Sequence, residues 1–309
     1  MNAAYDLQHT PAVRGRWRRA EPMARHSSWR CGGRAAAYFE PADRDDLVQF
    51  MRQTEPAVDI LWLGLGSNLL VRDGGVQSTV VATTAGLDRL HWESADVVYA
   101  ECGVPCAILA RDAARHDRAG LEFLAGIPGT VGGALRMNAG ALGSETWSFV
   151  QAVETIDRTG YVRRRMAEEF TPRYRGIDGP ELAFLGAWFA LRDSAGGQGS
   201  ARIRAVLAER SATQPTGKAS CGSVFKNPPG EFAGRLIDRC GLKGHRIGGC
   251  AVSTVHANFI VNDGAASATD IEALIAHVRA HVAEATGIVL EAEVQIVGDP
   301  GPQRMEDGV

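Results

Sequence analysis

The sequence has no long apolar run, and this absence excludes a whole class of proteins. No stretch of the 309 residues approaches the ~18 apolar residues that a membrane helix needs. The basic N-terminus has no apolar core of the kind that secretory signals carry. We therefore expect no membrane insertion and no secretory signal, and we predict that residues 1–24 form a disordered basic tail.

Metal-binding patterns are also missing. The six cysteines form no C-x-x-C pair, and no cysteine or histidine partners stand at zinc-site spacing. His277 and His281 are four residues apart on a predicted helix, but the glutamate of an H-E-x-x-H motif is absent, so an exposed helix face is expected. We predict no metal site. Reduced cysteines favour a cytoplasmic protein.

Strong positive charge is lacking as well. The net charge is −3, which argues against a general nucleic-acid-binding protein. The glycine run that begins at Gly64 resembles a dinucleotide fingerprint, but Leu69 occupies the third glycine position. A G-x-x-x-x-G-K-[ST] phosphate loop is absent too. Neither standard nucleotide-binding motif is therefore present.

The residues that are present predict mixed strands and helices. The order shows no regular βαβ alternation, which favours an α+β fold. A capping box at Ser267 and Asp270 starts the last helix, and Gly287 is expected to end it. The polar, glycine-rich stretch 192–200 is the best candidate linker. Strands are predicted in 59–71 and at 79–82, 96–101, 152–157, 182–191 and 288–297, and helices at 106–116, 201–212 and after Ser267.

Two glycine loops could bind a ligand. They span residues 64–68 and 129–133, within a stretch that is rich in glycine. Residues without Cβ allow a backbone to approach a ligand closely, and consecutive N–H groups can point at an anion. The loops could hold a diphosphate between them, or they could be two tight turns.

Ser223 could be a nucleophile, a proton donor or a turn residue. With Lys226 it matches the S-x-x-K motif of penicillin-recognising enzymes, which requires both residues on one turn of a helix. Pro228 and Pro229 leave little room for a helix, and the S-D-N and K-T-G partners are absent. A serine that delivers one proton needs only correct placement. A nucleophile is therefore disfavoured.

A series of motifs, in order along the chain, resembles the UDP-N-acetylenolpyruvoylglucosamine reductase (MurB) family. The similarity runs from about Trp29 to Gly298. The motifs are GLGSNLLV from Gly64, GLEFLAGIPGTVGG from Gly120, MNAG from Met137, Tyr174-Arg175, GSVFKNP from Gly222, AGRLI from Ala233, GLKG from Gly241, HANFIVN from His256 and LEAEV from Leu290.

The resemblance implies a flavoenzyme of peptidoglycan precursor synthesis. It would bind FAD non-covalently in a two-lobed domain of the vanillyl-alcohol-oxidase type, at residues 25–195 with subdomains 25–90 and 91–195. A C-terminal substrate domain would follow at 200–298, and a tail at 299–309. NADPH would reduce the flavin, which would reduce the enolpyruvyl double bond of the UDP-sugar to give UDP-N-acetylmuramate. A monomer is expected, with the UDP-sugar and NADPH as its partners.

The resemblance also assigns site residues. Ser223 would donate a proton to the intermediate carbanion, while Arg175 and Glu293 would polarise the carboxylate. Tyr174 and Asn227 would bind substrate. The residues expected to bind FAD are Gly64, Gly66, Ser67, Asn68, Leu69, Ile127, Pro128, Gly129, Thr130, Gly132, Gly133 and Asn138.

Three positions depart from the family pattern. Ile177 replaces a serine, Val255 replaces a lysine, and Gln295 replaces an arginine that could contact the UDP phosphates. No insertion follows Arg175, which indicates the shorter form of the family, without a tyrosine-bearing lid loop. Two alternatives stay open: a flavin-binding homologue with altered or lost substrate specificity, and an S-x-x-K acyl enzyme.

Overall fold

The computed structural model describes residues 12–180 and 182–301. These residues form helices and mainly antiparallel strands, which confirms the α+β prediction. The chain divides into two compact units, each built from separate stretches of sequence. Among the described residues, the first unit comprises 12–18, Tyr38–Leu65 and Ser78–Arg210, and the second comprises Arg19–Ala37, Gly66–Gln77 and 211–301.

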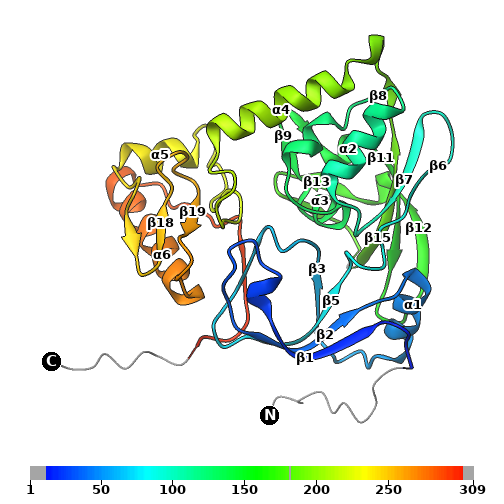
Figure 1. The fold of residues 1–309 in the computed structure, drawn as a ribbon, viewed down its shortest axis with the longest axis horizontal. Helices are drawn as coiled ribbons and strands as arrows, with labels where there is room; N and C mark the ends of the chain where they lie inside the picture. The colour runs from blue at the N-terminus through cyan, green and yellow to red at the C-terminus, as the bar shows by residue number, and fades with distance from the viewer. Residues whose placement is uncertain (1–11, 181, 302–309) are drawn as a thin grey trace. The chain divides into compact units, whose positions relative to one another are not determined.

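A five-stranded antiparallel sheet is the centre of the first unit (Figure 1). Its order is β12-β11-β15-β7-β6, and α2 and α3 cover one face. Leu109 of α2 and Leu135 of α3 belong to the same buried cluster as Val153 and Phe189 of the sheet. The elements are β6 (Leu90–Trp92), β7 (Val97–Glu101), α2 (Cys106–Arg115), α3 (Val131–Met137), β11 (Val150–Ile156), β12 (Val162–Met166) and β15 (Ala183–Ala190).

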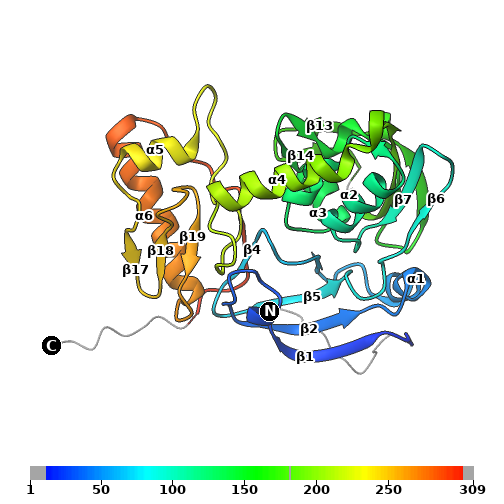
Figure 2. The ribbon, with the colours of Figure 1, turned by 45° about the horizontal axis from the view of Figure 1, so that its top comes forward.

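A second sheet has the strand order β1-β2-β5-β3, and Figure 2 shows β1, β2 and β5 side by side. In the first unit, helix α1 buries Leu47 and Phe50 with Phe39 and Val81. Asp43 caps this helix by accepting the Asp46 N–H at 2.9 Å. The elements are β1 (Arg16–Pro22), β2 (Arg34–Glu40), α1 (Arg44–Gln53), β3 (Ile60–Leu63) and β5 (Val76–Ala82).

The prediction of a disordered tail at residues 1–24 is wrong for residues 16–22, which form β1. Trp17 lies 4.9 Å from the Phe39 ring and 5.8 Å from the Phe50 ring, between ring centroids. The Arg14 guanidinium binds the Asp43 carboxylate at 2.6 Å. An aromatic contact and an ion pair therefore order a segment whose basic composition indicated a frayed end. Residues 1–11 lie outside the described residues.

The second unit packs two helices against a small sheet of order β17-β18-β19. Its buried cluster includes Trp29, Leu236, Leu274 and Val278. Strand β4 pairs in parallel with β20. The elements are β4 (Leu69–Val71), α5 (Ala233–Arg239), β17 (Arg246–Ile247), β18 (Cys250–Val252), β19 (Ile260–Asn262), α6 (Ala268–Thr286) and β20 (Gln295–Val297).

Most predicted elements are confirmed, with two differences. The predicted linker at 192–200 contains β16, η6 and the first residues of α4 (Gly199–Thr213). The strand predicted at 288–297 is regular only in β20, although its alternation of buried and exposed residues holds. The remaining short elements are η2 (Met23–Arg25), β8 (Arg118–Ala119), η3 (Glu122–Gly126), β9 (Gly140–Ala141), β10 (Ser144–Glu145), η4 (Thr146–Ser148), η5 (Ala167–Glu169), β13 (Thr171–Arg173), β14 (Gly176–Asp178), β16 (Arg192–Asp193) and η6 (Ala195–Gly197).

Candidate functional site

The two predicted glycine loops meet within the first unit at Gly64 and Thr130. A Cβ atom on Gly64 would lie 2.6 Å from the Thr130 hydroxyl oxygen, so only glycine allows this approach. Thr130 is buried and its backbone bridges to Pro105. The structure therefore places one end of the first loop against the second.

The second loop, residues 129–133, can present only part of its backbone to a ligand. The Val131 N–H donates to the Val104 carbonyl at 2.9 Å, and the Gly132 N–H donates to the Cys102 carbonyl at 2.8 Å. These two N–H groups are therefore not available to a diphosphate. Ile127 and Pro128 lead into this loop from the end of η3.

Gly132 and Gly133 have different reasons to be glycine. A Cβ on Gly132 would lie 2.9 Å from the Cys102 Cβ, so protein packing explains this residue. At Gly133 a Cβ would meet only the Thr130 hydroxyl, at 4.0 Å. Glycine inside a helix costs roughly 1 kcal/mol relative to alanine, and no close contact with the described residues explains its presence here. The close approach of a bound cofactor would explain Gly133, so this loop fits the flavin that the sequence predicts.

The first loop continues in the second unit, where Asn68 contacts the chain at Glu293. The Asn68 side-chain amide donates to the Glu293 carbonyl oxygen at 3.1 Å, and the Asn68 carbonyl accepts the Gln295 N–H at 3.0 Å. Gly66 has a left-handed backbone with φ of +62°, which brings its carbonyl to the Ser28 N–H at 3.2 Å. Ser67 lies in the turn before β4, which starts at Leu69. Asn68, one of the predicted cofactor residues, thus also holds the backbone at Glu293 and Gln295.

Ser223 lies in a non-helical segment of the second unit. Gly222 precedes it with φ of +54°. The Lys226 ammonium pairs with the Glu291 carboxylate at 2.5 Å. Because Ser223 and Lys226 do not share a helical turn and the lysine is held by an acid, the S-x-x-K acyl-enzyme alternative is wrong.

The structure brings the chain at Ser223 next to the chain at Glu293. Phe225 forms an antiparallel bridge with Ala292, and the Glu293 N–H donates to the Val224 carbonyl at 2.8 Å. Glu293 is half-buried, as is Ser223. Two residues to which the resemblance assigned catalytic roles are therefore neighbours across one pair of extended segments.

Arg175 occupies the turn of a hairpin in the first unit. Strands β13 and β14 pair on either side of Tyr174 and Arg175. Arg175 has φ of +57°, a conformation that costs energy for any residue other than glycine. Its guanidinium lies 4.9 Å from the centre of the Tyr174 ring and 3.5 Å from the Gly140 carbonyl oxygen.

Asn138 supports this hairpin from the end of α3. Its side chain is 1% exposed. The amide nitrogen donates to the Arg173 carbonyl at 3.2 Å and to the Glu145 carboxylate at 2.9 Å, while the amide oxygen accepts the Trp147 N–H at 3.2 Å. The amide is therefore engaged by protein groups, and its predicted contact with FAD stays a prediction.

Asn227 also has a structural contact. Its side-chain oxygen accepts the Ala233 N–H at 3.0 Å, at the first residue of α5. Tyr174 is 47% exposed. Both substrate-binding roles stay predictions.

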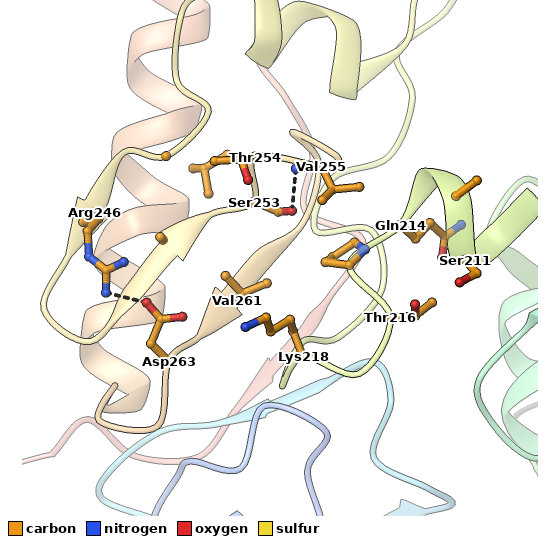
Figure 3. Close-up of a pocket in the computed structure, with 15 residues that line it drawn as sticks. Ser211, Gln214, Thr216, Lys218, Arg246, Ser253, Thr254, Val255, Val261 and Asp263 are labelled. Atoms are coloured by element: carbon orange, nitrogen blue, oxygen red, sulfur yellow. Dashed lines mark hydrogen bonds and ion pairs between the residues drawn. The ribbon is translucent and has the colours of Figure 1, made fainter.

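The three departures from the family pattern lie in different places. Ile177 is in β14 and packs against the core of the first unit. Gln295 begins β20. Val255 is 52% exposed and lines a cavity of about 620 Å³ in the second unit (Figure 3).

This cavity is separate from the predicted catalytic residues. Arg246 and Asp263 form an ion pair at 2.6 Å on one side, and Lys218 extends along the sheet between them and Thr216 (Figure 3). Neither Ser223 nor Glu293 lines it. We therefore assign it no part of the chemistry. Among the residues that the structure describes, no cluster of acids, cysteines and histidines could hold a metal ion, and no helix is long and apolar enough to cross a membrane.

Sequence reasoning missed Asn258. Its amide and backbone bind the two residues that follow Ser223. The signal was present in the His256-Ala-Asn258 motif, but nothing in the sequence indicated which segment the asparagine would contact.

Comparison with known proteins gives one consistent answer. The C-terminal domain of UDP-N-acetylenolpyruvoylglucosamine reductase matches residues 214–297, and an FAD binding domain matches residues 35–165. The reductase of Methylococcus capsulatus is 56% identical over 93% of this chain and 94% of its own length. That of Alkalilimnicola ehrlichii is 52% identical over 92% and 96%. The crystal structure of MurB from Thermus caldophilus matches with a TM-score of 0.79 and 32% identity, covering 92% of this chain and 99% of that one. The chain therefore belongs to the UDP-N-acetylenolpyruvoylglucosamine reductase family.

Proposed function

We propose that this protein reduces UDP-N-acetylenolpyruvoylglucosamine to UDP-N-acetylmuramate in peptidoglycan precursor synthesis, with NADPH as the reductant. The observation that carries the proposal is the pairing of the Ser223 segment with the Glu293 segment, through the Glu293 N–H and the Val224 carbonyl at 2.8 Å. It places a hydroxyl-bearing residue and an acid in one part of a chain whose relatives are named as this reductase.

FAD, when bound, would supply the hydride-transfer chemistry that links NADPH to the enolpyruvyl double bond. The residues proposed to hold it are Gly64, Gly66–Leu69, Ile127–Thr130, Gly132, Gly133 and Asn138. The support is the approach of Gly64 to Thr130 and the open position at Gly133. In this arrangement the backbone accepts the cofactor where a side chain would exclude it.

Three side chains act on the substrate. Hydride addition builds negative charge on the carboxylate side, and the Arg175 guanidinium stabilises that charge through two N–H donors. Glu293 polarises the same carboxylate, and because two ionised acids would repel, its proton contributes to this role. Ser223 then donates its hydroxyl proton to the carbanion. Tyr174 and Asn227 bind the UDP-sugar.

The remaining assignments complete the proposal. The FAD-binding domain spans residues 25–195 and the substrate domain spans 200–298. The protein works in the cytoplasm as a monomer, and its partners are NADPH and the UDP-sugar.

A flavin-binding homologue with altered or lost substrate specificity is the second candidate. The observation that favours it is Gln295, a neutral residue where the family pattern has a cation. One assay separates the two candidates. A reductase oxidises NADPH faster when the enolpyruvyl sugar is added, whereas a homologue that does not use this substrate shows no such increase. Both predict a yellow protein that releases FAD when it is denatured.

The decisive experiment measures the two half-reactions separately. Ser223→Ala should leave FAD binding and flavin reduction by NADPH near the wild-type level, because the serine acts only after hydride transfer. Anaerobic reoxidation of the reduced flavin by the enolpyruvyl sugar should fall by about 10²-fold or more. Ser223→Cys keeps a transferable proton and should retain more activity than the alanine variant.

Ser220→Ala is the matched control, because Ser220 is a half-buried serine in the same segment. It should reoxidise at the wild-type rate. Equal reoxidation by Ser223→Ala and the wild type would contradict the donor role. If the enolpyruvyl sugar does not reoxidise the reduced flavin of the wild-type protein, the proposed reductase activity is contradicted.

A further inference from the structure

Asn258 is buried and bonds to the two residues that follow Ser223. Its side chain is 4% exposed. The amide oxygen accepts the Phe225 N–H at 3.0 Å, and the amide nitrogen donates to the Phe225 carbonyl at 2.8 Å. The Asn258 backbone carbonyl accepts the Val224 N–H at 2.9 Å. One residue therefore makes three hydrogen bonds to this short segment.

The three hydrogen bonds from Asn258 satisfy backbone groups on one edge of the segment after Ser223, where a neighbouring strand would otherwise bind. On its other edge, the segment pairs with the chain near Glu293, through the Val224 carbonyl and the Lys226 N–H. Gly222, with φ of +54°, and Pro228 limit the length over which a regular ladder could form. A side-chain amide has one donor and one acceptor in fixed geometry, so it can imitate a strand partner at a single residue.

Asn258 is itself fixed in place. Its backbone N–H donates to Nδ1 of His256 at 3.2 Å, and the His256 N–H donates to the Ser253 hydroxyl at 3.3 Å. The Ser253 hydroxyl also accepts the Val255 N–H, the bond drawn in Figure 3. Burial, with a smaller contribution from Lys243, lowers the pKa of His256 and so favours the neutral ring, whose Nδ1 can accept the bond. The Asn258 amide therefore belongs to a turn that is held by several hydrogen bonds.

We infer that Asn258 is a positioning residue for Ser223 in the reduction. The inference rests on the proposed function and extends it, because it names a group that fixes the backbone immediately after the serine. A displacement of about 1 Å at a reacting group can cost about 10²-fold in rate. The Asn258 amide binds both backbone polar groups of Phe225, two residues from Ser223, and so restricts such a displacement.

Asn258→Asp is the sharpest test, because it preserves shape and replaces only the donor. The carboxylate can still accept the Phe225 N–H, but its second oxygen then faces the Phe225 carbonyl. We expect normal FAD content and a normal rate of flavin reduction by NADPH. Reoxidation by the enolpyruvyl sugar should fall about 10- to 100-fold at pH 8. It should recover as the pH is lowered, because a protonated carboxyl regains a donor.

Asn262→Asp is the matched control. Asn262 is a buried asparagine of the same unit, and its amide binds the Trp29 carbonyl at 2.7 Å and the Gly264 N–H at 2.7 Å. Its amide makes no bond to the Ser223 segment among the described residues. The control should show no selective loss of the second half-reaction and no recovery in acid.

The outcomes separate the inference from the function on which it rests. If Ser223→Ala lowers reoxidation while Asn258→Asp behaves like Asn262→Asp, the positioning role is refuted and the function survives. If the wild type is not reoxidised by the enolpyruvyl sugar, the function fails first. Should Asn258→Asp not fold, Asn258→Gln keeps both polar groups one methylene further out. A selective loss of reoxidation in that variant supports the role, and a wild-type rate refutes it.

Discussion

At the scale of single residues, three asparagine amides bond to backbone at or near the proposed catalytic residues. Asn258 binds the backbone after Ser223, Asn68 binds the Glu293 carbonyl, and Asn138 binds the carbonyl two residues before Arg175. An asparagine amide can pair with isolated backbone groups where no strand is available. The backbone at or near each proposed reactive residue is thus held by a hydrogen bond from an asparagine side chain.

Arg175→Lys tests the role of the guanidinium. Lysine keeps the charge and the hairpin turn but loses the planar fork that binds a carboxylate through two bonds. Turnover with the enolpyruvyl sugar should fall by about 10²-fold, while NADPH reduces the flavin at a near-normal rate. Stopped-flow absorbance of the flavin measures both steps.

Arg173→Lys is the control for this substitution. Arg173 lies in the same hairpin, where its guanidinium pairs with Asp178 at the surface. It should leave both half-reactions unchanged. Equal turnover by Arg175→Lys and the wild type would show that the guanidinium does not stabilise the developing charge.

The sequence could predict site residues by type and motif but not their mutual arrangement. Nothing local to Ser223 indicates that it lies beside Glu293, because that proximity depends on a pairing between segments about 70 residues apart. The same limit applies to Asn138, whose amide contacts are set by the fold of the region around it. Its predicted role as a cofactor ligand came from its motif alone.

At the scale of elements, α6 shows what local signals can determine. Ser267 and Asp270 form the predicted capping box, with the Asp270 N–H bound to the Ser267 hydroxyl at 3.1 Å. Gly287 ends the helix with φ of +73°. These signals act over a single turn, so they can be read from adjacent residues.

Two differences between prediction and structure come from distant partners. Strand β1 has a charged sequence, and its apolar contact is with Phe39 and Phe50, which follow later in the chain. Residues 288–294 alternate like a strand, but their partner segment contains Gly222 and Pro228 and cannot form a long ladder. In both cases the missing information belonged to another segment.

Asp73 adds a distant cap to α6 and provides a stability test. Its carboxylate accepts the Ala268 N–H at 3.0 Å and the Thr269 N–H at 2.8 Å. Asp73→Ala should cost about 0.5–2 kcal/mol, the usual value of a lost cap. The midpoint of thermal unfolding should fall by about 2–4 °C per kcal/mol, followed by circular dichroism with FAD present.

Asp238→Ala is the comparison for Asp73. Asp238 pairs with Lys243 at 2.8 Å, and both side chains are accessible to solvent. Such surface pairs contribute only about 0–1 kcal/mol. If the two variants unfold at the same temperature, the distant cap does not stabilise α6.

At the scale of the whole molecule, the free thiols report on packing. Five of the six cysteines are buried, and Cys240 is partly exposed. Burial raises the pKa of Cys102 and of Cys106 to about 12. A disulfide reagent at pH 8 should therefore modify one thiol in the native protein and six after denaturation. Cys240→Ser should abolish the native reaction, and rapid labelling of two or more thiols would contradict the packing.

The buried thiols should also make the protein less stable in alkali. Burial raises the pKa of Cys31 to about 12 and of Cys250 to about 11, above their value of about 9 in an unfolded chain. A group whose pKa is higher in the folded than in the unfolded chain makes its full contribution to stability when the pH is below the unfolded pKa. That stability is lost as the pH rises towards the folded value. The urea midpoint should therefore be lower at pH 10.5 than at pH 8.

The second unit is assembled from three stretches of chain, and this has a consequence for synthesis. Residues Arg19–Ala37 and Gly66–Gln77 leave the ribosome long before their partners in the described part of the second unit that begins at Ser211. Strand β4 cannot pair with β20 until residue 297 has been made. At about 5–20 residues per second, β4 waits on the order of 10–50 s for that partner. During this interval the apolar surface of Trp29 and Leu70 has no completed core to enter, which makes the nascent chain a candidate client for chaperones.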